Sequence, residues 1–312
     1  MNDNANIDFK FLMISAGFEH GGNVTQRFLD GHESLYVYPF ESQLGNRHFN
    51  DYLSSLERFQ YRYPEFPSGL SFHQLYELFY DEELKTLLRK PNGTKFKNAD
   101  LKMDEKVRIE FFGNHLKDKA LTRKNIVAAF FKATFDAWTN YKTSGKNEIY
   151  VGYSPIIGID APRILMDFPD GHIVHVVRNP FSAYSDTKKR PFPLPFQQYI
   201  CSWNLYHHIV LMHQQHYPEN IIIIRYEDLV DNPQVVMERI AAKIGIAFKE
   251  TMLHPSWNGM DLTNNIYPWG TIVSATSEAN LHAISELNKD EKQYIKKTSE
   301  LLLKYFGYDQ LV

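Results

Sequence analysis

Residues 17–23 read GFEHGGN and lie between an apolar run and a stretch with helical character. In a loop between a strand and a helix, successive backbone N–H groups and the positive end of the helix can bind a phosphate group. The spacing of Gly17 and Gly22 equals that of a Walker A loop, but Asn23 and Val24 stand where such a loop has its lysine and its Mg²⁺-binding hydroxyl. The segment therefore predicts a phosphate site without the lysine and the metal ligand of a kinase or an ATPase. The alternative is a glycine-rich turn that only reverses the chain.

A second group of candidate residues lies in the segment 172–190, which reads HIVHVVRNPFSAYSDTKKR. An apolar strand is predicted to end at Arg178, and Pro180 is typical of the first turn of a helix. Arg178 would then lie at the carboxyl end of a strand, where open parallel sheets bind their ligands. A guanidinium there can bind a phosphate by two hydrogen bonds, and Ser182 or Ser185 on the helix can donate a third. The alternative is a surface arginine paired with an acid.

The elements that must position these residues are short apolar or β-branched runs, each followed by a turn or helix-start signal. The first run, Phe9–Ala16, is followed by the glycine loop, by a helix predicted over Asn23–Leu29, and by the second run, Leu35–Tyr38. This order predicts a parallel sheet of the α/β class with helices on both faces. The predicted strands are Phe9–Ala16, Leu35–Tyr38, Glu148–Val151, His172–Val177 and Ile221–Ile224.

The remaining segments are predicted to be mostly helical. Residues 47–144 have the pattern of a helical insertion, and Phe196–Tyr217 predicts one long helix between two strands. A further helix is expected from Pro233 to the glycine at position 245, and a closing helix over Lys289–Phe306. Residues 253–276 are rich in Asn, Gly, Pro and Trp without periodicity, which predicts a long ordered loop of the functional kind.

The strand that ends in Arg-Asn-Pro, followed by a helical serine, resembles the 3′-phosphate motif of sulfotransferases that use 3′-phosphoadenosine 5′-phosphosulfate (PAPS). The glycine loop is similar to the 5′-phosphosulfate loop of that family. The similarities cover nearly the whole chain in the family's order, which implies one α/β domain over residues 1–312 with the P-loop-NTPase-like sulfotransferase fold. Further similar segments are RFLDGH at 27–32, YSP at 153–155, RYEDL at 225–229 with NP at 232–233, and YFGY at 305–308.

The resemblance also implies which residues bind the donor PAPS. Those expected to bind its 5′-phosphosulfate are His20, Gly21, Gly22, Asn23 and Val24, and those expected to bind its 3′-phosphate are Arg178 and either Ser182 or Ser185. Two positions depart from the family's pattern. Glu19 stands where the family usually has a lysine or arginine, and Asp186 stands where it usually has the motif serine.

Transfer of a sulfuryl group resembles phosphoryl transfer. It needs in-line alignment of the reacting groups and hydrogen-bond donors around the three equatorial oxygens. It also needs a base that takes the acceptor's proton and a group that stabilises negative charge on the leaving oxygen. Backbone amides with one or two cations suffice, so we expect no metal ion. With Glu19 at the usual cation position, the candidate cations are His20, Lys188, Lys189 and Arg190.

Glu41, in the segment YPFE just past the second predicted strand, is the candidate base. Its position resembles that of the glutamate base in the heparan-type members of the family, and a carboxylate there could take the acceptor's proton. The alternatives for Glu41 are a solvated loop acid or a structural salt bridge. His20 and His32 are rival candidates for the base, although His32 follows a predicted helix end, where histidines often act as caps.

The composition narrows the classes of protein to which the chain could belong. A formal charge of −3 gives no general reason to bind nucleic acid, and no apolar run approaches the length of about 20 residues that a membrane span needs. One cysteine, Cys201, excludes an internal disulfide, and the 13 histidines show no metal-binding spacing. We therefore expect a cytoplasmic enzyme that sulfates a hydroxyl or amine of a carbohydrate, lipid or small metabolite. The alternative is a catalytically silent nucleotide-binding protein of the same fold.

Overall fold

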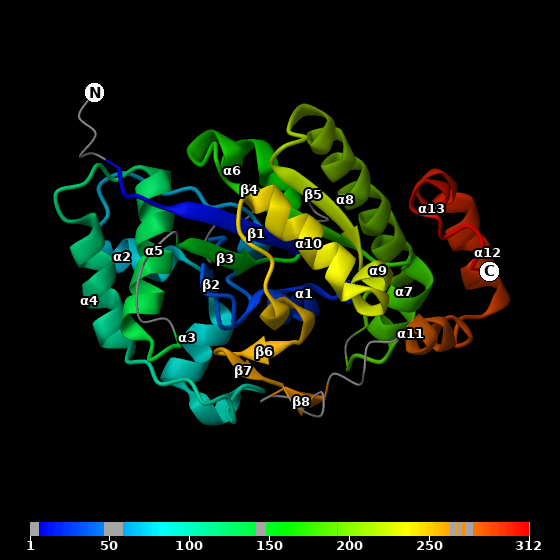
Figure 1. Cartoon of the computed structure of the whole chain (residues 1–312), viewed down its shortest axis with the longest axis horizontal. Coiled ribbons are helices and arrows are strands. Elements are labelled where there is room, and N and C mark those ends of the chain that lie inside the picture. Colours follow the sequence, from blue (N-terminus) through cyan, green and yellow to red (C-terminus); the bar gives the residue numbers. More distant parts are fainter. Residues whose placement is uncertain are drawn as a thin grey trace.

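Five parallel strands form the sheet at the centre of the molecule, in the order β2-β3-β1-β4-β5 (Figure 1). The computed structural model describes residues 6–46, 59–141, 148–191, 193–262, 266–267, 270–271 and 277–311. All five predicted strands are present, which confirms the α/β class. Their bounds are β1 Lys10–Ala16, β2 Leu35–Val37, β3 Ile149–Tyr153, β4 His172–Val177 and β5 Ile221–Arg225.

The central strand β1 is buried on both faces, as a strand inside a parallel sheet must be. Successive side chains of a strand point to opposite faces. Phe11 and Met13 therefore belong to one hydrophobic cluster, and Leu12 and Ile14 belong to another. This alternation explains why the sequence shows a continuous apolar run instead of an alternating one.

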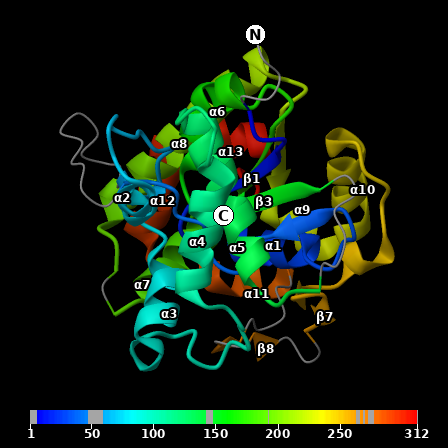
Figure 2. The same cartoon turned by 90° about the vertical axis from the view of Figure 1, so that its left-hand side faces the viewer.

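Helices cover both faces of the sheet (Figures 1 and 2). Side chains of α1 and α10 pack with Leu12 and Ile14 on one face, and side chains of α5, α6 and α8 pack with Phe11 on the other. The helices outside the insertion are α1 Gly22–Leu29, α6 Ala161–Asp167, α7 Pro180–Lys188, α8 Phe196–His216, α9 Tyr226–Asp231, α10 Pro233–Ile244, α11 Ser277–Ile284, α12 Lys289–Thr298 and α13 Glu300–Phe306.

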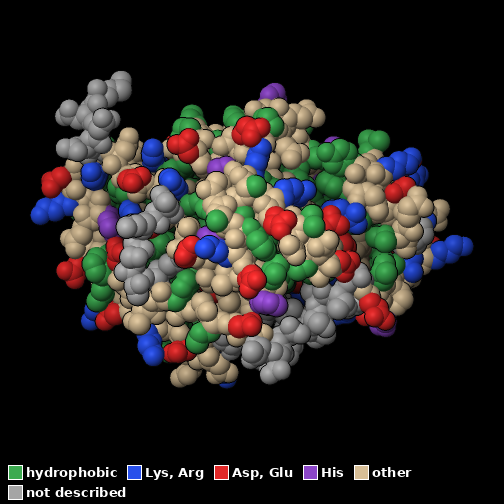
Figure 3. Space-filling model, in the orientation of Figure 1, with side chains coloured by type: hydrophobic (Ala, Val, Ile, Leu, Met, Phe, Trp, Pro, Cys, Tyr) green, Lys and Arg blue, Asp and Glu red, His purple; other side chains and the backbone are tan. Residues whose placement is uncertain are grey.

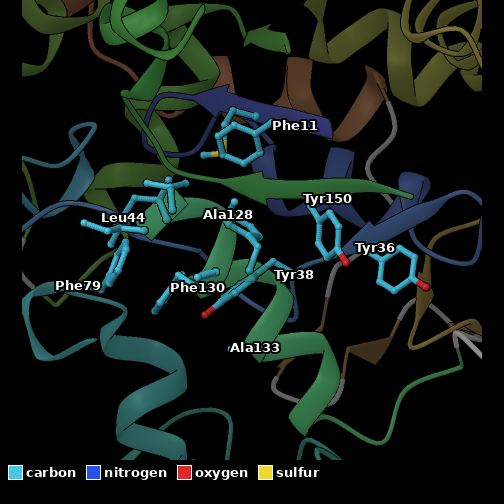
Figure 4. Packing of buried hydrophobic residues seen from close by; sticks show 14 of the residues in the cluster. Phe11, Tyr36, Tyr38, Leu44, Phe79, Ala128, Phe130, Ala133 and Tyr150 are labelled. Atoms are coloured by element: carbon cyan, nitrogen blue, oxygen red, sulfur yellow. The ribbon is translucent and has the colours of Figure 1, made fainter. Parts of the chain in front are cut away.

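The helical insertion lies between β2 and β3, as predicted, and its described part packs through aromatic side chains (Figure 4). Inside it, Arg108 forms an ion pair of 2.8 Å with Asp81, and both side chains are fully buried. Each of the two also hydrogen bonds to the hydroxyl of Tyr38, just past β2, at 2.8 Å. The insertion is thereby tied to the end of β2. Its helices are α2 Phe72–Leu78, α3 Glu82–Arg89, α4 Glu105–Leu116 and α5 Arg123–Ala137.

Two predicted segments differ from the structure. The closing helix is divided into α12 and α13 at Ser299, whose hydroxyl accepts a hydrogen bond of 2.9 Å from Asn204 on α8. The late loop contains two small antiparallel hairpins, which two-residue strands are too short to reveal by alternation. Their strands are β6 Ser256–Trp257, β7 Met260–Asp261, β8 Ile266–Tyr267 and β9 Gly270–Thr271, and the rest of the loop after 262 lies outside the described residues.

On the face seen in Figure 3, positive and negative side chains are interspersed, and those of the described residues form no basic stripe there. Among the described helices, none is long and apolar enough to cross a membrane.

Candidate functional site

The glycine loop connects the carboxyl end of β1 to the first turn of α1, where the sequence analysis placed it. Glu19 and Gly21 both have positive φ values, of 65° and 86°. Such reversals turn successive N–H groups toward one side of a loop. The first intrahelical bond runs from the amide of Thr25 to the carbonyl of Gly21 at 2.9 Å. The amides of residues 22–24 precede it, so they have no partner within the helix and can serve an anion.

Two tyrosine rings pack against the loop and explain its adjacent glycines. A Cβ atom on Gly21 would lie 2.3 Å from the ring of Tyr226, and one on Gly22 would lie 2.3 Å from the ring of Tyr153. Tyr153 ends β3 and Tyr226 begins α9, so the loop is held between the ends of two different strand–helix units. Larger residues at these positions would push the loop away from both rings.

Arg178 follows β4 directly, at the carboxyl end of a strand as predicted, and it lies beside this loop. Its Nη1 atom donates a hydrogen bond of 2.7 Å to the carbonyl of Glu19, and its guanidinium carbon lies 5.1 Å from the ring centre of Tyr226. Its Nη2 atom is 2.8 Å from the carboxylate of Asp186. The side chain is 10% exposed, so the guanidinium is fixed at the sheet edge.

The two candidate serines are buried on α7. The backbone amide of Ser182 donates to the side chain of Asn179, which caps the helix, at 2.8 Å. Asn179 is fixed in turn by Glu227, which accepts hydrogen bonds from its amide and its side chain. The hydroxyl of Ser185 donates to Glu286 at 2.6 Å.

The surroundings of His20 do not fit its expected role as a cation. Its ring is 2% exposed and stacks on His207 with ring centres 5.2 Å apart. Burial, followed by the charges of His175 and Arg178, lowers the pKa of His20 to about 3. The ring is therefore neutral at physiological pH and brings no positive charge to the loop.

Arg190 is the candidate cation that the structure places at the loop. Its Nε atom is 2.6 Å from the carboxylate of Glu19, and its guanidinium carbon lies 5.6 Å from the ring centre of Phe18. Lys188 instead pairs with Glu291 at 2.9 Å. A cation from just past α7 therefore lies at the loop, where it pairs with Glu19 itself.

Glu41 lies beyond β2, in a segment that is firmly anchored. The side chain of Gln26 on α1 donates to the carbonyls of Tyr38 and Phe40, at 2.7 and 2.9 Å. The amide of Ser42 donates to the carbonyl of Tyr153 at 2.8 Å, which continues the pairing of the two strands. Glu41 is therefore held next to the end of β3, close to the loop.

The carboxyl group of Glu41 lies near a second carboxylate. The amide of Glu41 donates to Glu83 on α3 at 3.1 Å, and Gln43 donates to the Glu41 carboxylate at 3.1 Å. Burial, followed by the negative charge of Glu83, raises the pKa of Glu41 to about 8, against the opposing effects of Gln43, Lys95 and Arg190. A carboxyl group with this pKa can exchange a proton near neutral pH.

His32, the other rival base, is a structural residue. Its Nε2 atom lies 2.9 Å from the carbonyl of Ala247, and its Nδ1 atom accepts from the amide of Ser34 at 3.0 Å. Both ring nitrogens therefore contact backbone groups outside α1, one just before β2 and one after α10, so neither of these contacts is the helix cap that its position in the sequence indicated.

A cavity of about 150 Å³ opens beside the loop. The loop contributes Gly17, Phe18 and His20 to its wall, and the helix α8 contributes Tyr199 and Trp203. Apolar and aromatic surface predominates in the wall. A ligand that fits there would bury an apolar or aromatic portion against these rings.

Sequence reasoning missed Glu83 and both loop-packing tyrosines as parts of this site. Glu83 is 42 residues from Glu41 and lies within the helical insertion, where no motif marks it. Tyr153 and Tyr226 do lie in segments that resemble family motifs, so their positions gave a signal, but their packing against glycines did not. Among the described residues, no group of three or more His, Cys, Asp or Glu side chains is placed to hold a metal ion.

Comparisons with known proteins identify the family and the fold of the chain. A family model described as the sulfotransferase family matches residues 42–250, which is more than half of the chain. The sulfotransferase domain from the curacin biosynthetic pathway is 16% identical, with a TM-score of 0.53, over 95% of this chain and 98% of that domain. The sulfotransferase domain from the Synechococcus PCC 7002 olefin synthase is 17% identical, with a TM-score of 0.47, over 91% and 96%. No curated protein sequence matches the chain.

Proposed function

Since the chain belongs to the sulfotransferase family, we propose that it transfers a sulfuryl group from PAPS to a hydroxyl or amine of a carbohydrate, lipid or small metabolite. The observation that carries this proposal is the contact between Arg178 and the loop. The guanidinium donates to the carbonyl of Glu19 at 2.7 Å, so a fixed cation contacts the same loop that ends in the amides left unpaired by the helix at the start of α1. This arrangement suits a ligand with two anionic groups.

The proposed roles follow from what each residue touches. The amides at Gly22, Asn23 and Val24 bind the phosphosulfate, and Arg178 binds the 3′-phosphate. Arg190 stabilises the negative charge that develops on the leaving oxygen, because it is the cation paired with the loop residue Glu19. The donor supplies the sulfuryl group, and no step in this scheme uses a metal ion.

Glu41 is the proposed base, which takes the proton of the acceptor hydroxyl or amine. Its carboxyl group is held beside the end of β3, and burial with Glu83 raises its pKa to about 8. The charges of Glu41 and Glu19 both act on Tyr153, after burial, to raise its pKa well above the usual range. The ring of Tyr153 therefore lies within the field of both the loop and the proposed base.

The aromatic cavity beside the loop is the proposed site for the acceptor. Its wall supports an acceptor with an apolar or aromatic portion over a large, highly charged glycan, because charged groups would lose hydration there without a partner.

Donor binding can be tested by calorimetry with adenosine 3′,5′-bisphosphate, the product that PAPS leaves. We expect heat of binding with the unaltered protein and much weaker binding with Arg178→Ala. No heat with the unaltered protein would contradict the proposal. Transfer of labelled sulfate to a panel of phenols, alcohols, amines and glycans then tests the reaction and the acceptor class.

The ion pair between Glu19 and Arg190 favours a second candidate function, a nucleotide-binding protein without catalysis. In this reading Glu19 neutralises the cation that transfer needs. Such a protein binds the bisphosphate but sulfates no member of the panel, whereas labelled sulfate on any acceptor excludes it.

A further inference from the structure

The carboxylate of Asp186 forms an ion pair with Arg178, the residue that binds the donor's 3′-phosphate in the proposed function. Its Oδ2 atom is 2.8 Å from Nη2 of Arg178, and its Oδ1 atom is 3.1 Å from Nζ of Lys189. One carboxylate thus bridges two cations, as a phosphate group would. The Asp186 side chain is 29% exposed, whereas that of Arg178 is 10% exposed, so solvent reaches the acid more than the cation.

A second carboxylate stands next to this bridge. Glu286 accepts a hydrogen bond of 2.6 Å from the hydroxyl of Ser185, and its Oε2 atom is 3.2 Å from Nζ of Lys189. The two cations, Arg178 and Lys189, are therefore balanced by two acids. A phosphate ester that entered this group would face two negative charges at close range, and such like-charge contacts are costly.

We propose that Asp186 is a specificity-determining residue of the donor site. Its carboxylate competes with a phosphate on the donor's 3′-hydroxyl, so that a 3′-phosphorylated nucleotide binds only by displacing Asp186 from Arg178. This inference rests on the proposed function, which places a nucleotide donor in the site.

The rest of the site allows such an exchange without a change of fold. Arg178 is held independently of Asp186 by the carbonyl of Glu19 and by the ring of Tyr226. The guanidinium therefore keeps its place whichever anion pairs with its Nη2 atom. Asp186, on the exposed side of α7, can rotate toward water, at the cost of its contacts with Arg178 and Lys189. The unaltered protein should therefore gain less affinity from a nucleotide's 3′-phosphate than Arg178 would provide without this competitor.

Calorimetry with two nucleotides tests the competition. Adenosine 3′,5′-bisphosphate and adenosine 5′-phosphate differ by the phosphate in question. We expect Asp186→Asn to raise the affinity for the bisphosphate by about tenfold or more, because the substitution removes the competing charge and leaves an uncharged side chain. The affinity for the 5′-phosphate should stay within about twofold. Asp186→Ser provides a second variant with the same expected direction, and thermal unfolding checks that both variants are folded.

A matched control lies at the end of the neighbouring strand. Asp228 pairs with Arg225 across three residues, with 3.9 Å between the atoms, also at the junction of a strand and a helix. Asp228→Asn removes an acid from an arginine that the proposal does not involve, so we expect both nucleotide affinities to stay unchanged.

The outcomes separate this inference from the proposed function. If both nucleotides bind the unaltered protein and neither Asp186 variant changes their ratio, the role of Asp186 is overturned and donor binding stands. Weaker binding of the bisphosphate to the variants also overturns the role of Asp186, because Asp186 would then assist binding. If neither nucleotide binds any form of the protein, both proposals fail.

Discussion

The backbone amide of Glu41 donates a hydrogen bond of 3.1 Å to the carboxylate of Glu83, which places two acidic side chains at the end of β2. Glu83 also pairs with Lys95 at 3.1 Å, so its negative charge is held in position. Burial and this neighbouring charge together raise the pKa of Glu41 to about 8. A residue of the helical insertion thereby adds to the effect of burial on the proton affinity of a residue just past β2.

The first prediction concerns the pH dependence of turnover. A base acts in its ionised form, and with a pKa of about 8 only about a tenth of Glu41 is ionised at pH 7. The rate should therefore rise with pH and level off above about 8. Glu83→Gln removes the neighbouring charge and frees Lys95 to act on Glu41, so the inflection should move to lower pH. Initial rates across pH, measured with labelled donor, provide the check.

The oxygen of the amide in Glu83→Gln can still accept from the Glu41 backbone, so a structural loss is not expected. An inflection that stays in place would show that Glu41 is not the titrating base.

The second prediction separates the base from donor binding. Glu41→Gln should lower turnover by roughly 10²–10⁴-fold, the range typical of a lost general base, while the affinity for adenosine 3′,5′-bisphosphate changes little. Glu82→Gln is the matched control, because Glu82 is an exposed acid at the start of the same helix that carries Glu83. Equal turnover in the Glu41 variant and the control would refute the assignment. His20 would then be the remaining candidate, because both ring nitrogens of His32 contact the backbone, at Ala247 and Ser34.

The third prediction concerns stability. A carboxyl group whose pKa is raised from 4.5 to about 8 in the folded protein binds its proton more tightly than in the unfolded chain. Its ionisation therefore destabilises the fold, increasingly as pH rises from about 4.5 to about 8 and fully above that. Glu41→Gln removes this cost. The unfolding temperature of the variant, relative to that of the unaltered protein, should increase between pH 5 and pH 9 in thermal scans. A constant difference across this range would contradict the raised pKa.

The fourth prediction tests the cation at the loop. Arg190→Met should lower turnover by about tenfold or more, because a positive charge near the leaving oxygen is lost. The side chain is 39% exposed, so water screens part of its effect. Lys188→Met is a closely matched control, since Lys188 is 37% exposed and pairs with Glu291 instead of the loop. Equal rates in the two variants would assign the charge to another residue.

The fifth prediction concerns the packing of the loop. Gly21→Ala and Gly245→Ala both place a Cβ at positive φ, of 86° and 74°, but only at Gly21 would the new atom meet a ring, that of Tyr226 at 2.3 Å. Nothing lies within 4 Å at Gly245. Gly21→Ala should therefore cost about 1–3 kcal/mol more in the free energy of unfolding than the control. Denaturant titration of both variants measures the difference, and equal costs would mean that the ring moves freely.

Much of the sheet could be predicted from the sequence, for a definite physical reason. Each parallel strand is buried on both faces, so it appears as a short apolar run between turn residues. Arg178 and the glycine loop follow two such runs, and parallel strands bring their carboxyl ends to one edge. Their contact at 2.7 Å is the consequence.

The parts that could not be predicted depend on contacts between distant residues. The break at Ser299 involves Asn204, 95 residues away, and an unbroken helical pattern does not reveal it. The neutral state of His20 follows from its burial against His207, whereas its place in the loop made it a candidate cation. Arg190 reaches Glu19 across 171 residues, so the sequence offered three basic residues in a row without distinguishing them.

The helical insertion joins the sheet through the ends of β2 and β3, and it carries Glu83 to the proposed base and the Arg108–Asp81 pair to Tyr38. The loop and Arg178 directly follow strands β1 and β4, outside it. A chimera that received this insertion from a relative would thus keep its own residues for binding the nucleotide, while the pKa of its base would shift with the charge that the new insertion places beside it. In such a fold, nucleotide recognition and proton affinity can evolve on separate stretches of the gene.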